Sequence, residues 1–384
     1  MHKIPYGRQH ITQDDIDAVV NVLKSDFLTQ GPHIKDFENA FAEYVGSKYA
    51  VAVSNGTAAL HLNAMALGVK PGDKVITTPI TFVASANCVR YCGGEVVFGD
   101  IDPESYLLDI NHVRKLLEED SQKEIKGIIP VNFSGRMVDM EAFRELADEF
   151  GCWIIEDACH SPGGYFVNSR GEEIKSGSGM YADLSIFSFH PVKHIAAGEG
   201  GMITTNDEEL YKHLLILRTH GIQQDLTRRI YDDSLWYYEM QELGYNYRLT
   251  DFQAALAKSQ LIRAKEGIAK RIVIAQKYND FFKDKSYIKR QSGVIDGHAY
   301  HLYIIEVNKR KELHKYLRDN NIFAQIHYLP VHLMPYYRDQ GYNEGDLPNA
   351  EEYYAGCISL PMYPTLTDQE FDFVLECIDV FFSS

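Results

Sequence analysis

The chain has 384 residues, a formal net charge of −16 at pH 7 and six cysteines that form no CxxC pair. This length exceeds what one hydrophobic core usually organises, so we expect two domains. The acidic balance argues against nucleic acid or an anionic membrane as a partner, and no apolar run reaches the length of a membrane span. Most cysteines lie in apolar segments and no signal-peptide pattern opens the chain, which together predict reduced thiols and a cytoplasmic location.

The first part of the chain alternates short apolar strands with amphipathic helices. Thr12 is expected to cap a first helix, and a second helix is expected over residues 34–44. Strands are then expected at 49–53, 74–78, 95–99, 126–131 and 152–156, and helices at 57–67, 82–91, 110–117 and 140–150. This alternation is typical of a mostly parallel sheet covered by helices on both faces, which binds ligands at the carboxyl ends of its strands.

Further along the chain the alternation weakens. Two apolar strands at 185–189 and 202–205 precede a helix at 207–219, and a capping box from Thr250 to Gln253 opens a long helix that would bridge two domains. A smaller α/β unit would follow, with strands at 301–307 and 323–326 and helices at 311–317 and from Thr367. We therefore predict an N-terminal arm and large domain over residues 1–260, and a small C-terminal domain over residues 261–384.

Three of the predicted strands end in residues that could bind a cofactor. Gly56 and Thr57 open a helix whose free N–H groups could cradle a phosphate, although a plain helix cap is equally consistent. Phe82 could stack on a flat cofactor, but an aromatic residue there is more often part of the core. Asp157 ends a buried strand, where it either pairs with a group such as a protonated ring nitrogen or caps the following turn.

Lys193 lies in an irregular turn between two apolar strands, next to a proline and three glycines. A desolvated lysine has a lowered pKa and can form a Schiff base, whereas most turn lysines are solvated surface charges. His190 and His194 have the spacing of a metal site, but Pro191 breaks the helix that such a site needs, and we expect no metal. Along the chain, a phosphate cradle is followed by an aromatic ring, a carboxylate and a lysine. This order matches what pyridoxal phosphate (PLP) requires.

Over nearly its full length the chain resembles the sugar aminotransferases of the DegT/DnrJ/EryC1/StrS family. The resemblance rests on SNGTAALHL (54–62), TTPITFVASAN (77–87), EDACHS (156–161), FSFHPVKHIAAGEGG (187–201), GYNYRLTDFQAAL (244–256) and HYLPVHLMPYY (327–337). It implies the α/β architecture of fold type I PLP-dependent aminotransferases. A large domain then carries a mostly parallel sheet between helices, and a smaller α/β domain follows it.

The resemblance also implies roles for single residues. Lys193 would bind PLP through a Schiff base and move the proton between cofactor and substrate carbons, with pyridoxamine phosphate (PMP) as the alternate form of the cofactor. Asp157 would pair with the pyridinium nitrogen. The other implied cofactor contacts are Gly56, Thr57 and Ser188 at the phosphate, Phe82 on the ring, and His160, which replaces the glutamine of many relatives. Asn246 and Arg248 would complete the partner's phosphate site, which implies a homodimer with two shared active sites.

Within the family, the chain resembles most the members that act in pseudaminic acid and surface glycan biosynthesis. Those members transfer an amino group from L-glutamate to C4 of a UDP-linked 4-keto-6-deoxy sugar, UDP-2-acetamido-2,6-dideoxy-β-L-arabino-hexos-4-ulose. The stretches FLTQG (27–31) and SLPMYP (359–364) and the lysine turn carry this resemblance. The residues that would line the nucleotide-sugar pocket are Tyr6, Phe27, Leu28, Thr29, Gln325, His327 and Tyr328, and the segment 223–241 is a further candidate.

Three alternatives remain open at this point. The acceptor could be another nucleotide-linked 4-keto sugar, for example of the perosamine or bacillosamine type. A sugar dehydratase is a second alternative, but dehydratase relatives have histidine at the position of Lys193. A sensor that only binds the cofactor is a third, and it is disfavoured because the sequence has no appended helix-turn-helix segment or basic patch.

Overall fold

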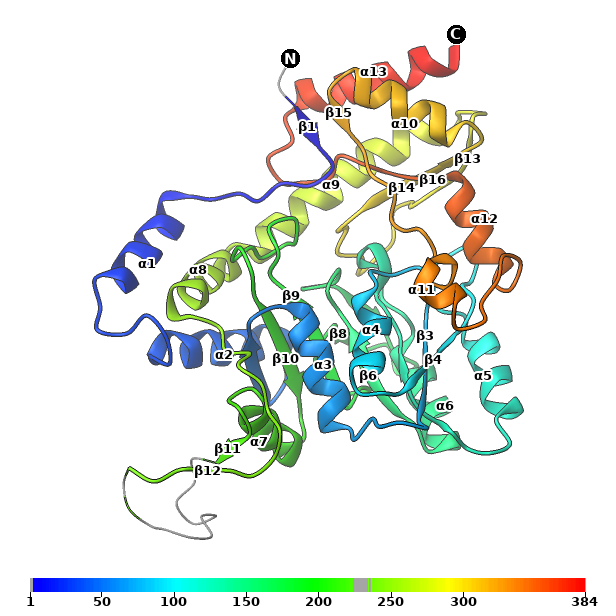
Figure 1. The fold of residues 1–384 in the computed structure, drawn as a ribbon. Coiled ribbons are helices and arrows are strands. Elements are labelled where there is room, and N and C mark those ends of the chain that lie inside the picture. The colour runs from blue at the N-terminus through cyan, green and yellow to red at the C-terminus, as the bar shows by residue number, and fades with distance from the viewer. Residues whose placement is uncertain (1–2, 224–233, 235, 384) are drawn as a thin grey trace.

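A seven-stranded sheet forms the centre of the computed structural model shown in Figure 1, which describes residues 3–223, 234 and 236–383. In spatial order its strands are β2 (Tyr49–Val53), β10 (Gly201–Thr205), β9 (Leu184–Ser188), β6 (Trp153–Asp157), β5 (Ile125–Ile129), β3 (Lys74–Thr77) and β4 (Glu95–Phe98). β10 is antiparallel to both of its neighbours, and the other neighbouring strands run parallel. The prediction of a mostly parallel sheet is confirmed.

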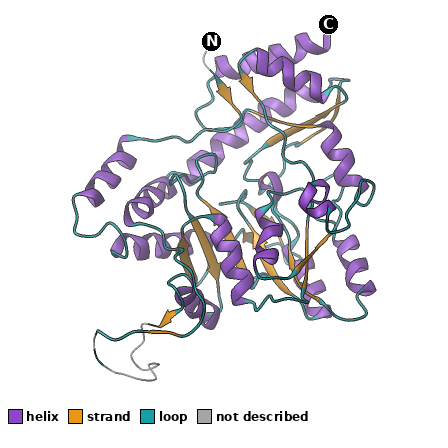
Figure 2. Cartoon of the chain, viewed as in Figure 1, coloured by secondary structure: helices purple, strands orange, loops and turns teal. Residues whose placement is uncertain are grey.

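Alternate side chains of the strands enter two separate cores, as the two-residue period of a strand requires. In β2, Ala52 packs into a core with α2 (Pro32–Val45) and α8 (Asp251–Ile262), whereas Val53 packs into a core that includes α3 (Gly56–Ala66) and α7 (Glu208–Leu217). In β9, Phe187 enters the first core and Ile186 the second. The sheet is therefore buried on both faces, and Figure 2 shows the helices surrounding its strands.

Further helices and short strands complete this large unit. They are α1 (Gln13–Leu23), α4 (Ala84–Tyr91), α5 (Ile110–Glu119), the 3₁₀ turn Phe133–Gly135, α6 (Met140–Phe150), the hairpin of β7 (Tyr165–Val167) and β8 (Glu173–Lys175), and the hairpin of β11 (Ile222–Gln223) and β12 (Glu239–Met240). The sequence missed these hairpins, because strands of two or three residues carry no readable alternation. Most of the segment 223–241 lies outside the described residues.

A smaller unit surrounds the antiparallel sheet β13 (Ile288–Gln291), β14 (Tyr303–Val307) and β16 (Cys357–Leu360). Its helices are α9 (Ala264–Phe282), α10 (Arg310–Asp319), α11 (Pro335–Arg338), α12 (Pro348–Gly356) and α13 (Asp368–Ser383), with a 3₁₀ turn at Val331–Leu333. The chain's start joins this unit, because β1 (Ile4–Pro5) pairs in parallel with β15 (Ile322–Phe323), and Figure 1 shows the two side by side near α13. The exact domain boundary stays a prediction.

Two predicted elements differ from the structure. The long helix opened by Thr250 is two helices, α8 and α9, which meet at Arg263, where the backbone (φ −99°, ψ 5°) ends one and begins the other. α8 packs on α1 and α2, whereas α9 continues into the core of the small unit. The strand expected at 323–326 is shortened to β15, after which Gln325 pairs by its backbone with Ser359. Within the described residues, we find no helix both long and apolar enough to cross a membrane.

Candidate active site

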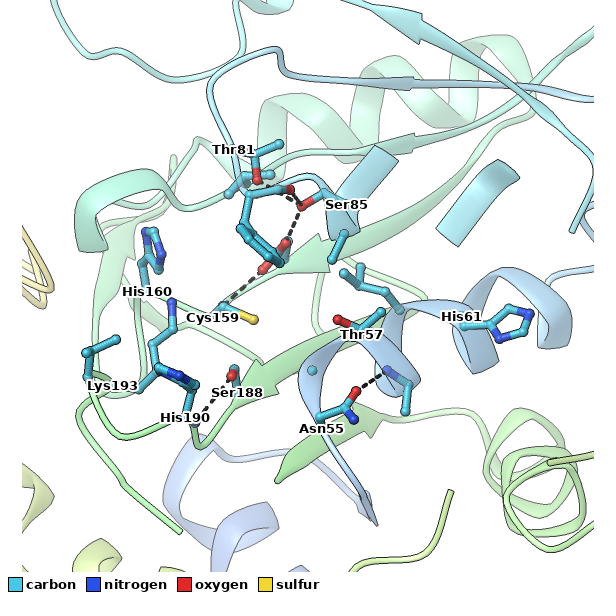
Figure 3. A pocket seen from close by; sticks show the side chains of 18 of the residues that line it. Asn55, Thr57, His61, Thr81, Ser85, Cys159, His160, Ser188, His190 and Lys193 are labelled. Atoms are coloured by element: carbon cyan, nitrogen blue, oxygen red, sulfur yellow. Dashed lines mark hydrogen bonds between the residues drawn. The ribbon is translucent and has the colours of Figure 1, made fainter. Parts of the chain in front are cut away.

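A cavity of about 960 Å³ lies where β2, β3, β6 and β9 end. The predicted site residues that line it are Tyr6, Gly56, Thr57, Phe82, Asp157, His160, Ser188, Lys193, His327 and Tyr328. They come from six stretches of the chain that are far apart in sequence, and Figure 3 shows several of them around one space. The carboxyl edge of the sheet is therefore where these residues meet, as expected for a sheet of this kind.

The first turn of α3 forms an anion cradle on one wall. The Asn55 side chain accepts a hydrogen bond from the Ala58 N–H at 2.8 Å, while helix geometry leaves the N–H groups of Gly56 and Thr57 without an intrahelical acceptor. Ser188, at the end of β9, lies opposite: a Cβ atom on Gly56 would come 3.1 Å from the Ser188 Cβ. Free amides, a hydroxyl and the space left by a glycine fit the phosphate of PLP.

Asp157 ends β6 and points its carboxylate toward the same space. Its Oδ2 accepts a hydrogen bond from the Ser85 hydroxyl at 2.7 Å, and its Oδ1 accepts one from the Cys159 N–H at 3.1 Å. The Ser85 hydroxyl also lies 2.8 Å from that of Thr81. With only 4% of its surface exposed, the carboxylate is fixed in orientation and keeps lone pairs for a donor in the cavity, such as a protonated ring nitrogen.

Lys193 belongs to the turn between β9 and β10, where its N–H donates a hydrogen bond to the His190 carbonyl at 2.8 Å. Burial lowers the pKa of its ammonium, and the nearby Cys159 and Asp157 raise this pKa only in part. Lys193 therefore loses its proton at a lower pH than a surface lysine does, and this supplies the neutral amine that a Schiff base requires. Phe82 is 59% exposed at the rim of the same cavity, where it is free to cover a flat ring.

A group of histidines, which we call the histidine wall, surrounds Lys193: His160, His194, His301 and His327. Burial lowers the pKa of each, and the positive charge of Lys193 lowers it further. The Ser134 N–H donates to Nδ1 of His160 at 3.3 Å, so the proton of the neutral ring lies on Nε2, 3.4 Å from the Tyr328 hydroxyl. Three of these neutral rings, those of His160, His301 and His327, line the cavity.

Tyr6 reaches the cavity from the N-terminal arm. Its ring centroid lies 4.9 Å from that of His327, and its carbonyl accepts a hydrogen bond from the Met362 N–H at 2.8 Å. Nδ1 of His327 lies 2.9 Å from the Ser359 hydroxyl. The arm, the small unit and the large unit thus all contribute to the lining of the cavity.

Several predicted site residues do not line this cavity. They are Phe27, Leu28, Thr29, Gln325, Asn246 and Arg248. Asn246 is exposed, and Arg248 instead lines a second depression between α2 and α7, of about 640 Å³. Backbone bridges hold these loops to the edge of the sheet and to each other, through the pairs Val53–Arg248 and Thr29–Thr250. Phe27 and Leu28 are about half exposed, at 53% and 49%.

The structure adds residues that sequence reasoning missed. Ser85 lies three residues after Phe82 in α4, and a hydroxyl beside a strand end was the only available signal. His301 and His61 line the cavity as well, but nothing in their sequence surroundings distinguished them from core histidines. Among the residues that the structure describes, no cluster of three histidine, cysteine, aspartate or glutamate side chains could hold a metal ion.

Comparisons with known proteins agree with this geometry. Residues 9–379 match the DegT/DnrJ/EryC1/StrS aminotransferase family. The chain is 38% identical to the spore coat polysaccharide biosynthesis protein SpsC of Bacillus subtilis, over 98% of this chain and 96% of SpsC. It is 34% identical to a UDP-4-amino-4,6-dideoxy-N-acetyl-β-L-altrosamine transaminase of Campylobacter jejuni, over 98% and 96%. Its fold matches that of Helicobacter pylori PseC, an aminotransferase involved in the biosynthesis of pseudaminic acid, with a TM-score of 0.90, 30% identity and full coverage of both chains.

Proposed function

We propose that this chain, which belongs to the DegT/DnrJ/EryC1/StrS aminotransferase family, transfers the amino group of L-glutamate to C4 of a UDP-linked 4-keto-6-deoxy-hexose. It is a PLP-dependent sugar aminotransferase, and solved relatives carry PLP or PMP. The observation that carries the proposal is the meeting of Lys193, Asp157 and the α3 anion cradle in one cavity. UDP-2-acetamido-2,6-dideoxy-β-L-arabino-hexos-4-ulose is the first acceptor to test, because the Campylobacter and Helicobacter relatives have names that point to this chemistry.

Each wall of the cavity has a task in this proposal. When bound, PLP supplies an electron sink for the carbon that gains or loses the amino group. Gly56, Thr57 and Ser188 hold its phosphate through N–H and O–H donors. Asp157, fixed by Ser85, keeps the ring nitrogen protonated because a carboxylate stabilises a neighbouring cation.

Lys193 performs the proton transfer. Its amine, which burial makes less basic, would accept the proton that leaves the α-carbon of the donor and would release it later in the reaction. In the second half of the reaction, with the sugar as the acceptor, Lys193 would transfer the proton in the opposite direction. His160, whose Nε2 proton faces the cavity near Tyr328, is placed to contact the ring substituents of the cofactor.

We assign the sugar end of the cavity to Tyr6, His327 and Tyr328, which the N-terminal arm and the small unit contribute. SpsC, at 38% identity, belongs by its name to spore coat polysaccharide biosynthesis. Another nucleotide-linked 4-keto sugar therefore remains the alternative acceptor. Dehydration of the sugar is disfavoured, because Lys193 stands where dehydratase relatives have histidine.

We further propose a homodimer in which each cavity is completed by the other chain. Asn246 and the segment 27–29 are exposed and Arg248 is partly exposed, but none of them lines the cavity of its own chain. A second chain would place Asn246 and Arg248 at the partner's phosphate cradle, and Phe27, Leu28 and Thr29 at its substrate entrance, whereas the backbone of Gln325 pairs with Ser359 in its own chain. A cytoplasmic location stays a prediction, supported by six free cysteines of which four are buried.

The decisive experiment is a two-step titration of the purified enzyme loaded with PLP. L-Glutamate should abolish the visible absorbance of the lysine-linked cofactor, and the correct UDP-4-keto sugar should restore it. Lys193→Ala should lose turnover by more than about 10³-fold, beyond the usual range for one general base, because the same residue also holds the cofactor. Normal amino transfer by this variant, or no response to any amino donor, would contradict the proposal.

Shared sites can be tested by mixing two inactive variants. Lys193→Ala and Arg248→Ala would each have low activity alone. A heterodimer of the two variants contains one active site with both substitutions and one active site with neither. Mixing after mild dissociation should therefore recover up to a quarter of wild-type activity, from half of the molecules with half of their sites. If activity does not rise above the sum of the separate variants, Arg248 acts within its own chain or not at all.

A further inference from the structure

Arg271, in α9, is a buried cation without a carboxylate partner among the described residues. Its surface is 2% exposed, and Nη1 donates hydrogen bonds to the carbonyls of Tyr300 at 3.0 Å and Met362 at 2.7 Å. Nε has no hydrogen-bond partner, and no Asp or Glu of the described chain forms an ion pair with this side chain. Buried charges are normally paired with an opposite charge, so the surroundings of the Arg271 guanidinium lack an anion.

His301 connects Arg271 with the cavity. Its carbonyl lies 3.5 Å from Nη1 of Arg271, and its ring lines the cavity. The ring is held between two others of the histidine wall, with centroids 4.2 Å from His160 and 5.7 Å from His194. The residue is 3% exposed, so its ring is fixed by packing and its orientation is set before a ligand arrives.

The hydrogen bonding of the His301 ring is incomplete. Nδ1 is buried and has no partner, which leaves Nε2 as the nitrogen that a ligand in the cavity can reach. The proton of the neutral ring is best placed on Nε2, since an N–H on Nδ1 would have no acceptor. Burial lowers the pKa of the ring most, and the nearby His160, Lys193, His194 and Arg271 lower this pKa further, so the ring remains a neutral N–H donor.

The charged residues that line the cavity do not supply a cation for the carboxylates of the amino donor. Among the described residues, its lining contains two carboxylates, Asp157 and Glu199, one lysine, Lys193, and no arginine, and Arg248 of the partner subunit is assigned to the phosphate. The amino donor of the proposed function carries carboxylates, and Lys193 is reserved for the cofactor and proton transfer. A carboxylate therefore needs another donor with positive charge behind it.

We propose that His301, positioned by Arg271, binds a carboxylate of the amino donor. This rests on the proposed function and names the donor end of the same site. The carboxylate accepts the Nε2–H of His301, and its charge balances the buried guanidinium of Arg271. His301 then contacts substrate directly, whereas Arg271 acts through His301 as a positioning residue.

The experiment compares donor and acceptor binding in His301 variants. His301→Leu should raise the KM for L-glutamate by about 10- to 100-fold, the value of one hydrogen bond to a charged group, and leave the KM for the UDP-4-keto sugar within about twofold. Glutarate, which has both carboxylates but no amino group, should lose affinity by the same factor in calorimetry. His301→Gln, which keeps an N–H, should fall between wild type and His301→Leu.

His332→Gln is the matched control, because His332 is fully buried, bonds Glu351 and does not line the cavity. It should leave both KM values and glutarate affinity within about twofold of wild type. Arg271→Met should weaken glutarate binding, and Arg271→Lys, which keeps the charge, should weaken it less. Unchanged glutarate affinity in His301→Leu, or equal losses for donor and sugar, would overturn the inference.

The outcome is separable from that of the proposed function. Glutarate binding and the loss of visible absorbance on adding glutamate report on the donor end alone, without any sugar. If wild type converts no UDP-4-keto sugar, the acceptor assignment fails, yet the His301 comparison still gives its answer. If wild type responds to glutamate but His301→Leu responds at the same concentration, only the His301 assignment fails.

Discussion

Glu156 and Asp157 are neighbours on β6, yet their carboxylates are treated in opposite ways. Glu156 points away from the cavity and accepts hydrogen bonds from Asn132, Ser185, Ser176 and the Gly177 N–H, at 2.7 to 3.2 Å. The carboxylate of Asp157 accepts one hydrogen bond from the Ser85 hydroxyl and one from the Cys159 N–H, and it faces the cavity. The protein itself satisfies the hydrogen bonding of the Glu156 carboxylate, whereas the Asp157 carboxylate can still accept a hydrogen bond from a ligand.

The histidines of the 298–301 loop repeat this contrast. Nδ1 of His298 accepts the Tyr300 N–H at 2.8 Å, and its Nε2 lies 3.2 Å from the Ser134 hydroxyl. His301, three residues later, lines the cavity, and its Nδ1 is buried without a partner among the described residues, which leaves Nε2 to bond a ligand. Buried polar groups are normally satisfied within a protein, so those left incomplete beside a cavity indicate where a ligand completes them. This contrast yields five predictions.

The largest expected effect is on Asp157→Asn. The amide keeps the size of the side chain, and its oxygen can accept from the Cys159 N–H while its NH₂ donates to the Ser85 hydroxyl, but it cannot stabilise a protonated ring nitrogen. Turnover should fall on the order of 10²-fold, as for other lost electrostatic contacts to a reacting group, while the unfolding midpoint stays near that of wild type. Steady-state kinetics with thermal unfolding as the control tests this, and a variant that keeps wild-type turnover would remove Asp157 from the chemistry.

Glu156→Gln should show the reverse pattern. One oxygen of Glu156 accepts from Asn132 and the other from the Gly177 N–H, so a glutamine NH₂ must face one of these donors. The free energy of unfolding should fall by about 1–3 kcal/mol, with turnover at low temperature nearly unchanged. Denaturant titration measures the first and kinetics the second. Loss of turnover without loss of stability would reverse the roles assigned to the two carboxylates.

Glu156 also makes stability depend on pH. Burial raises its pKa above the usual value, so the folded state binds a proton more readily than the unfolded state does. Its contribution to stability is therefore lost as pH rises from the unfolded pKa through the raised folded pKa. In Glu156→Gln this pH dependence should disappear, and equal slopes of stability against pH in both proteins would contradict it.

Ser85→Ala should have a smaller effect than Asp157→Asn. The change removes the hydroxyl that holds Oδ2 of Asp157 but leaves the carboxylate in place. Turnover should fall about three- to tenfold, the equivalent of one hydrogen bond, with the KM for glutamate less affected. Ser85→Thr keeps a hydroxyl and serves as the control, so an equal fall in both variants would indicate a packing effect.

The smallest effect concerns the titration of Lys193 in protein without cofactor. Because burial lowers its pKa, its half-maximal labelling by acetic anhydride should occur at lower pH than that of the lysine in a short model peptide. Asp157→Asn should lower this pH further, since the carboxylate raises the pKa of Lys193. Peptide mapping by mass spectrometry follows the labelling of Lys193, and a profile identical to that of the model peptide would show that Lys193 is solvated.

Much of the fold and the cofactor end of the site could be predicted from sequence. Alternating apolar strands and amphipathic helices gave the sheet, and the residues after its strands gave Gly56, Asp157 and Lys193, because parallel strands bring their carboxyl ends to one edge. The break at Arg263 was not predictable, since α8 and α9 carry one continuous helical pattern and separate only where they join different cores.

The sequence by itself thus determined the fold class and the family, since each depends on local pattern and order along the chain, and it predicted the residues proposed to bind the cofactor. Only the tertiary structure decided which polar groups are satisfied. Ser85 reaches Asp157 across 72 residues and Arg271 holds the His301 loop across 30, and no local pattern encodes such distances. Tertiary packing alone also directed Arg248 away from its own cavity, because that depends on how the edge of the sheet is covered.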